Sequence, residues 1–143
     1  MAEHWPRVEQ GHPLAIVLLD LDHFKRVNDT HGHDTGDAVL RETAGLLQAH
    51  CRHADLAVRY GGEEFLLAMS GAERSAAETV AERLRSAIAA HPWSRLAAGL
   101  EVTTSVGLAD AAEVLDAPAL LTLADRRLYA AKYGGRNRVV VSD

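Results

Sequence analysis

The chain has 143 residues, the size of a single domain, and 48% of them are hydrophobic, enough to build a packed core. No apolar run reaches the ~20 residues of a membrane span, Met1–Gln10 lacks the apolar stretch of a signal peptide, and the lone Cys51 excludes an internal disulfide. From these features we predict a cytoplasmic domain without membrane contact. A net charge of −5 disfavours nucleic acid as a partner.

The first part of the chain predicts a strand followed by two helices. Leu14–Leu19 is a continuous apolar run ending at Asp20, which is typical of a buried strand. His23–Asn28 predicts a short helix, and the polar residues 29–37 that follow predict a loop. Apolar residues at helical spacing then predict a helix over Asp37–His50.

The middle of the chain predicts a β-hairpin. Leu56–Tyr60 and Phe65–Met69 have the composition of strands, and Gly61-Gly62 between them is a strong turn signal. The remaining predicted elements are a helix at Ser75–Ala90, a strand at Val102–Leu108, a helix at Pro118–Lys132 that ends near Gly134, and a strand at Arg138–Val141.

The resulting order, β-α-α-β-β-α-β-α-β, predicts an α+β fold. Its alternation and central hairpin favour a ferredoxin-like, palm-type sandwich, in which helices pack on one face of a mostly antiparallel sheet.

Two groups of carboxylates lie at the ends of these predicted strands. Asp20 and Asp22 follow the first strand, and Glu63 and Glu64 follow the glycines of the hairpin. If the two elements are neighbours, the carboxylates converge, and oxygen ligands of this kind suit Mg²⁺ or Mn²⁺ in phosphoryl transfer. Taken singly, the first pair also fits a helix N-cap and the glycines an ordinary turn. The chain is acidic in its first half and basic at its C-terminal end. This asymmetry fits a cation-binding site approached by a phosphate-binding segment, and it also fits ordinary surface charge.

Read together, the motifs resemble the GGDEF family, which comprises diguanylate cyclases. The resemblance extends from Leu14 to Val140, with every motif in order, and the hairpin has the variant sequence Gly-Gly-Glu-Glu-Phe. The strings that carry it are Asp20-Leu-Asp-His-Phe-Lys-Arg-Val-Asn-Asp29, Gly32-His-Asp-Thr-Gly-Asp37, Arg59-Tyr-Gly-Gly-Glu-Glu-Phe65, Ser105-Val-Gly107, and Ala124-Asp125 with Leu128-Tyr-Ala-Ala-Lys-Tyr-Gly-Gly-Arg-Asn137.

The resemblance implies a palm-type nucleotidyl cyclase fold with helices packed around the sheet. It also implies condensation of two GTP into cyclic di-GMP, with release of two pyrophosphates. Two Mg²⁺ or Mn²⁺ ions per site would be held by Asp20, the Leu21 carbonyl and Glu63. Glu63 would also activate the ribose 3′-hydroxyl, with Glu64 as a helper and Lys25 stabilising charge in the transition state.

The same resemblance implies a set of substrate contacts. Asn28 and Asp37 would read guanine, with Leu40 as the apolar wall of that pocket. Phosphates would be held by the turn at Phe24 and Lys25 and by basic residues near the C-terminus. The implied substrate-binding residues are Phe24, Lys25, Asn28, His33, Asp37, Leu40, Gly61, Gly62, Lys132 and Arg136.

A further motif, Arg52-His-Ala-Asp55, resembles the family's product-inhibition site. Arg52 and Asp55 would bind cyclic di-GMP, joined by Arg83 from the next helix. A surface ion pair is the alternative. Zinc is a second alternative for the histidines around His31-Gly-His33, although no helical His pair or Cys cluster supports it. The sequence favours packing or interface roles for Trp5 and Trp93.

The segment that usually precedes the first strand in this family is missing, so we interpret residues 1–143 as one GGDEF domain with a truncated N-terminal helix. It would belong to a larger protein with regulatory domains and act as a homodimer, because the reaction joins two bound nucleotides. The rival functions are a non-catalytic GTP- or cyclic di-GMP-binding regulatory module and a palm-type nucleotidyltransferase acting on nucleic acid, which the charge disfavours.

Overall fold

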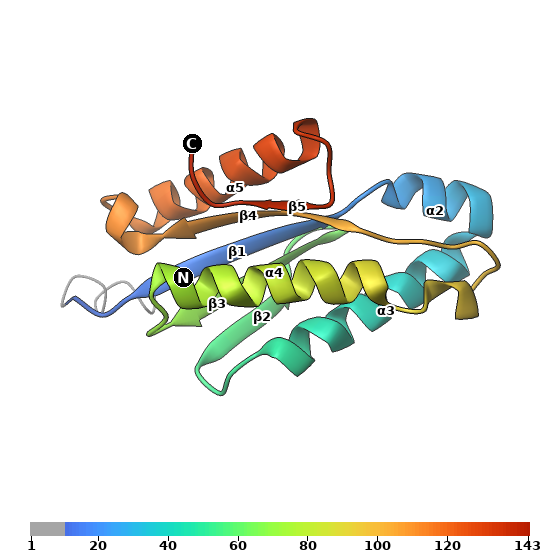
Figure 1. Cartoon of the computed structure of the whole chain (residues 1–143), viewed down its shortest axis with the longest axis horizontal. Helices are drawn as coiled ribbons and strands as arrows, with labels where there is room; N and C mark the ends of the chain where they lie inside the picture. The colour runs from blue at the N-terminus through green and yellow to red at the C-terminus, as the bar shows by residue number, and fades with distance from the viewer. Residues whose placement is uncertain (1–10) are drawn as a thin grey trace.

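The computed structural model describes residues 11–143 as one mixed sheet surrounded by helices (Figure 1). The elements follow one another in the predicted order, which confirms the α+β fold class. They are β1 (Leu14–Leu21), α2 (Phe24–His31), α3 (His33–His50), β2 (Asp55–Arg59), β3 (Glu64–Ser70), α4 (Arg74–Ala90), β4 (Thr104–Asp110), α5 (Ala117–Tyr133) and β5 (Arg138–Val140), with 3₁₀ turns at Trp93–Arg95 and Ala111–Glu113.

The sheet has the strand order β2-β3-β1-β4-β5. All neighbours pair antiparallel except β4 and β5, which run parallel. Every residue of the central strand β1 is buried. A strand covered on both faces needs apolar side chains on both, which is why Leu14–Leu19 reads as a continuous apolar run rather than an alternating one.

The order of elements predicted helices on one face of the sheet, which is wrong, whereas the arrangement implied by the family resemblance, with helices packed around the sheet, is confirmed. Ala15, Val17 and Leu19 of β1 share a core with residues of α3 and α4. Leu14 and Ile16 point the other way and share a second core with residues of α5. Figure 1 shows α5 on the side of the sheet opposite α3 and α4. Strand periodicity sends successive side chains to opposite faces, so a fully apolar β1 requires a helix on each side.

Gly107 explains how closely α5 approaches the sheet. A Cβ atom built at this position of β4 would lie 2.2 Å from the carbonyl oxygen of Ala124 and 2.3 Å from the amide nitrogen of Leu128. Both are backbone atoms of α5, which cannot yield as the end of a side chain can. The glycine of the Ser105-Val-Gly107 motif therefore allows the α5 backbone to rest directly on β4.

The predicted loop over residues 29–37 is also wrong. α2 continues to His31 and α3 begins at His33, so only Gly32 separates the two helices. Gly32 has a φ of 91°, and its N–H donates to the carbonyl of Asn28. A single glycine in this conformation is enough to turn the chain, and the polar residues around it lie on exposed helix surface.

Trp93 packs in the core, as expected: it is 2% exposed, and its indole N–H donates to the carbonyl of Ile88 at 2.7 Å. The interpretations placed on Trp5 and on Met1–Gln10 lie outside the described residues. Within residues 11–143, no helix has the length and apolar character required to cross a membrane.

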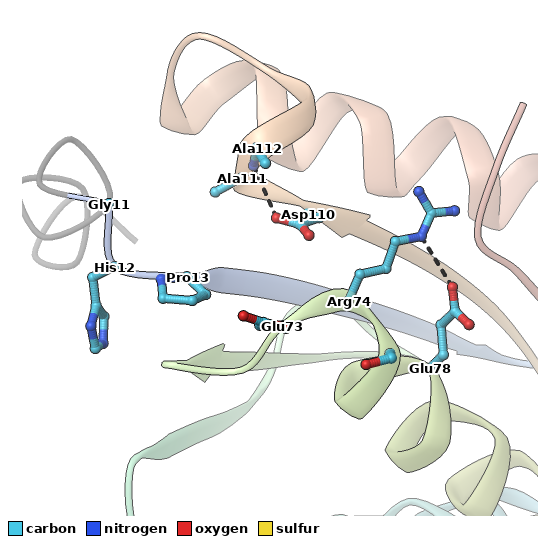
Figure 2. Close-up of a pocket in the computed structure, with 10 residues that line it drawn as sticks. Gly11, His12, Pro13, Glu73, Arg74, Glu78, Asp110, Ala111 and Ala112 are labelled. Atoms are coloured by element: carbon cyan, nitrogen blue, oxygen red, sulfur yellow. Dashed lines mark hydrogen bonds and ion pairs between the residues drawn. The ribbon is translucent and has the colours of Figure 1, made fainter.

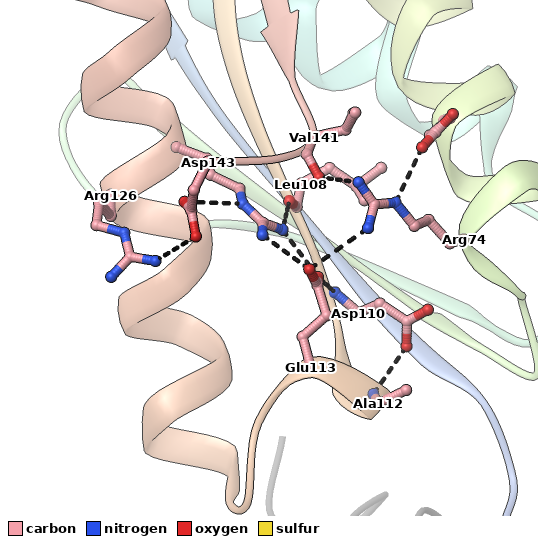
Figure 3. Close-up of polar contacts among 10 residues, drawn as sticks. Arg74, Leu108, Asp110, Ala112, Glu113, Arg126, Val141 and Asp143 are labelled. Carbon is pink, nitrogen blue, oxygen red and sulfur yellow. Dashed lines mark hydrogen bonds and ion pairs between the residues drawn. The ribbon is translucent and has the colours of Figure 1, made fainter.

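A polar network ties the C-terminal residues to the end of the sheet remote from Asp20. Arg127 is 3% exposed and forms a two-pronged pair with Glu113, at 2.8 Å for each nitrogen, and also donates to the carbonyl of Leu108. Arg74 reaches Glu113 and the carbonyl of Val141 (Figure 3). The hydrogen bonds that Glu113 accepts from Arg127 lower the pKa of Glu113 from 4.5 to about 2, despite the opposing effect of burial.

We expect Glu113→Gln to lower the free energy of unfolding at neutral pH by about 1–3 kcal/mol, because a buried guanidinium loses its charged acceptor. A carboxyl whose pKa is lowered on folding stabilises the protein above its unfolded pKa. That contribution falls as the pH drops from 4.5 toward 2. Urea unfolding at pH 7 and pH 3 measures both effects: the difference between wild type and variant should shrink in acid. Glu73→Gln, at an exposed position, is the control.

Candidate active site

The β1 end, the hairpin and the end of α5 bring charged residues together at one rim of the sheet. Asp20 is 4% exposed, and its carboxylate accepts a hydrogen bond from the Lys132 ammonium at 2.5 Å. Glu64 pairs across the sheet with Asp20, and Glu63 precedes it in the hairpin. All four residues were predicted as site residues. The fold brings them together although Asp20 and Lys132 are 112 positions apart in the sequence.

The carboxyls of this cluster disturb one another's ionisation. Burial raises the pKa of Glu63, and the negative charge of Asp20 raises it further. The same two causes, in the same order, raise the pKa of Glu64. Burial works to lower the pKa of Lys132, but its hydrogen bond to Asp20 and its attraction to the nearby carboxylates raise it overall. The rim is therefore negatively charged, and Lys132 forms an ion pair with Asp20 there.

The hairpin turn is held by backbone and side-chain contacts. The Leu21 N–H donates to the carbonyl of Glu63 at 3.2 Å, which fixes the turn to the end of β1. Arg59 donates to the carbonyl of Gly62, at 2.6 Å from one guanidinium nitrogen, and to that of Gly61. Sequence reasoning did not single out Arg59 as a site residue, although it opens the quoted hairpin string.

The first turn of α2 lies beside this rim. Phe24 is buried as a core residue and Lys25 is exposed. His23 precedes the helix in the left-handed conformation, with a φ of 55°, and no side chain caps the helix. Asp22 is therefore not an N-cap, the alternative raised by its position. The first backbone N–H groups of a helix have no partner within it, so this turn leaves donors facing outward.

A pocket of about 350 Å³ lies between α3 and the hairpin strands. Asp37, Leu40 and Arg41 line it from α3, and Arg59 and Phe65 line it from the hairpin. It combines an apolar wall with charged side chains, which suits a flat, polar-edged ligand such as a nucleobase.

Asn28 approaches the residue before Asp37. Its side-chain oxygen would lie 1.8 Å from a Cβ atom at Gly36, so a larger residue there would displace the Asn28 side chain. Asn28 is not among the residues that line the α3 pocket, whereas Asp37 is. His33 is exposed in the first turn of α3.

Arg136 lies in the turn between α5 and β5, exposed and with a φ of 62°. Its N–H donates to the carbonyl of Ala131 at 2.9 Å, which places the turn directly after the helix end that carries Lys132.

Arg52 and Asp55 form a close pair at the start of β2. The guanidinium donates to both carboxylate oxygens, at 2.7 Å for the shortest contact, and the Asp55 side chain is fully buried beneath it. Arg83 is exposed on α4, and within residues 11–143 no hydrogen bond or ion pair joins it to this pair.

A larger cavity, of about 610 Å³, lies elsewhere. His12, Glu73, Arg74 and Asp110 are among the residues around it, at the opposite end of β1 from Asp20 (Figure 2). None of the predicted site residues lines it, so its size does not identify the chemistry.

The donor chemistry of the rim fits a divalent cation. Carboxylate and carbonyl oxygens are ligands that Mg²⁺ and Mn²⁺ prefer. Burial and then the negative charge of Asp20 raise the pKa values of Glu63 and Glu64, and a cation would relieve the second of these causes. Within residues 11–143, however, no three His, Cys, Asp or Glu side chains form a ready-made metal-binding group. Asp20 is instead paired with Lys132, so a cation would have to displace the ammonium.

The family model described as "Diguanylate cyclase, GGDEF domain" matches residues 1–138. A similar protein from Treponema denticola, named diguanylate cyclase A, is 40% identical over 135 residues. The match covers 94% of this chain and 36% of that protein, so the chain spans about a third of the relative's length.

Two solved structures have nearly the same fold. The GGDEF domain of DgcB from Caulobacter crescentus, determined in complex with c-di-GMP, is 34% identical with a TM-score of 0.89, covering 97% of this chain and 84% of that one. The active GGEEF domain of a diguanylate cyclase from Vibrio cholerae is 30% identical with a TM-score of 0.91, covering 99% and 90%.

Proposed function

The chain belongs to the GGDEF family, and from that premise we propose that it is a diguanylate cyclase: it condenses two GTP into cyclic di-GMP and releases two pyrophosphates. The observation that carries the proposal is the meeting of Asp20, Glu63, Glu64 and Lys132 at one rim. Similar proteins named diguanylate cyclases and a neighbour bound to c-di-GMP support it.

The cofactor in this proposal is Mg²⁺ or Mn²⁺, two ions per site. Asp20, the Leu21 carbonyl and Glu63 would hold them. When bound, the ions would neutralise phosphate charge and lower the pKa of the attacking hydroxyl.

The protein's own groups bind and orient the nucleotide. The Asp37 carboxylate can accept from the N1–H and N2–H₂ of guanine, and Leu40 covers one face of the base. The N–H groups at the start of α2 and the cations of Lys25, Lys132 and Arg136 would hold the phosphates.

Bond formation requires two such sites. The 3′-oxygen of one GTP, after giving its proton to Glu63, attacks the α-phosphorus of the other. The bond from that phosphorus to the bridging oxygen breaks, and pyrophosphate leaves. A single site cannot supply both the attacking 3′-oxygen and the α-phosphorus that it attacks. A homodimer is therefore part of the proposal, and the two attacks together close the ring.

Regulation by other domains is also proposed. The chain spans 36% of its Treponema relative, and a similar Pseudomonas aeruginosa cyclase, SiaD, was solved in complex with an activator. GTP is a cytoplasmic nucleotide, so the proposal places the reaction in the cytoplasm.

The direct test is to incubate the purified chain with GTP and either Mg²⁺ or Mn²⁺, and to measure cyclic di-GMP and pyrophosphate. The two products should appear in a ratio of one to two, with a rate per protein that rises with protein concentration as dimers form. Nucleotide binding without either product would favour the regulatory module instead, and ATP in place of GTP should give no product.

We further propose that the Arg52–Asp55 pair binds the product and slows the enzyme. Arg52→Ala should leave the initial rate unchanged and raise the cyclic di-GMP concentration for half-inhibition at least ~10-fold, because a two-pronged charged contact is lost. Progress curves with added product measure this. Arg95→Ala, which removes an exposed arginine paired with Glu42 at 2.6 Å, is the matched control and should retain inhibition. Equal inhibition of both variants would leave Arg52 as a surface ion pair.

A further inference from the structure

Asp22 is a buried carboxylate that the proposed reaction does not use. It follows β1 directly and is 7% exposed. None of the ion pairs within residues 11–143 includes it. A buried carboxylate without a cation is costly unless hydrogen-bond donors satisfy it, so its partners indicate what it is for.

Three donors from two distant segments converge on Asp22. The hydroxyls of Thr103 and Ser105 donate to its two carboxylate oxygens, each at 2.6 Å. The backbone N–H of Asn137 donates to it at 3.0 Å. Short O–H···O contacts of this kind are typical of a charged acceptor. The carboxylate thus joins the end of β1 to the start of β4 and to the turn before β5.

The turn that Asp22 holds has an uncommon backbone. Gly135, Arg136 and Asn137 have φ values of 125°, 62° and 45°, so two successive non-glycine residues are left-handed. Such residues persist only where their surroundings fix them. The Asn137 side-chain oxygen accepts a hydrogen bond from Arg85 at 2.7 Å, and the Asn137 N–H donates one to the Asp22 carboxylate. Asp22 therefore supplies one of two anchors at the second left-handed residue.

We propose that Asp22 is a positioning residue, which sets the place of Arg136 by holding the turn directly after the helix end that carries Lys132. This inference rests on the proposed function, in which Arg136 contacts the phosphates. It gives Asp22 a task different from that of its neighbour two residues earlier: Asp20 faces Lys132, whereas Asp22 faces the turn that follows Lys132 in the chain. Because Asp22 bonds to this turn and leaves α2 uncapped, it also does not compete with phosphate for the helix N–H groups.

The first experiment measures the anchor without any substrate. Hydrogen exchange of the Asn137 amide is followed by NMR in the full chain and in Asp22→Asn, which keeps the shape but replaces one acceptor oxygen with a donor. We expect exchange at Asn137 to be at least ~10-fold faster in the variant. Asp29→Asn removes the same charge from an exposed position of α2 and should leave this amide unchanged.

The second experiment tests whether Asp22 acts through Arg136. A GTP analogue with carbon in place of the α–β bridging oxygen cannot release pyrophosphate, so its dissociation constant with Mg²⁺ reports binding alone. Asp22→Asn should weaken binding ~10–100-fold, as the loss of a supporting contact does at other sites. Arg136→Gln should also weaken it, and the double variant should be no weaker than the worse single variant.

The outcomes separate the two proposals. Unchanged Asn137 exchange, or additive losses in the double variant, would overturn the positioning role while the wild-type chain still binds the analogue. A wild-type chain that binds no analogue would overturn the proposed function, and this role with it. If Asp22→Asn does not fold, Thr103→Val replaces it, since valine matches the shape of threonine and removes only the hydroxyl donor. It should shift both measurements in the same direction by a smaller factor.

Discussion

We expect Glu63→Gln to lower the rate of cyclic di-GMP formation by about 10³-fold or more, while the chain stays folded. Glutamine has nearly the same shape as glutamate but can neither accept the proton of the 3′-hydroxyl nor offer an anionic ligand to the metal. The Glu63 backbone, which bonds to Leu21 across the end of β1, is unaffected by the change. The rate of pyrophosphate release at saturating GTP and Mg²⁺ measures the loss.

The same variant should gain stability in metal-free buffer. Burial and the charge of Asp20 raise the pKa of Glu63, so its ionised form is disfavoured in the folded state. A carboxyl with a raised pKa contributes stability while protonated and loses it as the pH rises through that pKa. At neutral pH the neutral amide should therefore raise the free energy of unfolding by about 0.5–2 kcal/mol, as relief of a strained active site commonly does. A loss of activity accompanied by a loss of stability would point to a damaged fold instead.

Much of the fold follows from local patterns in the sequence. The apolar run of β1 and the glycine turn of the hairpin are signals within a few residues of one another, and both elements were predicted. The predicted loop over residues 29–37 was wrong because polar composition does not distinguish an exposed helix from a loop. A single residue, Gly32, separates the two helices. The order of elements alone missed the place of α5 on the second face, because the signal is the absence of alternation in β1, together with the lack of a Cβ at Gly107.

The chemical residues of the site were found through family motifs, but their partners were not. Lys132 was expected to contact phosphate, and the structure pairs it with Asp20, 112 residues away. The position of Asp22 in the sequence suggested a helix cap, whereas its hydrogen-bond donors lie 81 to 115 residues further along the chain. Contacts across such separations depend on the register of β4 against β1 and on the turn before β5. No short pattern encodes either.

Asp20→Asn should likewise reduce the rate by about 10³-fold, for a different reason. Asp20 is the buried member of the rim and the acceptor for Lys132, so the variant loses an anionic metal ligand and releases the ammonium. Two effects on stability oppose each other: the ion pair is lost, and the repulsion of Glu63 and Glu64 is relieved. Because Lys132 keeps those two carboxylates as neighbours, we expect the free energy of unfolding to change by less than about 2 kcal/mol.

Asp22→Asn is the matched comparison, because it makes the same chemical change at a buried carboxylate two residues away. Turnover at increasing Mn²⁺ distinguishes them: Asp20→Asn should require a higher metal concentration and still reach a low rate, since a ligand is missing. Asp22→Asn should keep the wild-type dependence on metal and instead require more GTP, since only the turn that carries Arg136 is displaced. If Asp20→Asn kept the wild-type rate, Asp20 would serve the fold through Lys132 alone and the metal would have to be held elsewhere.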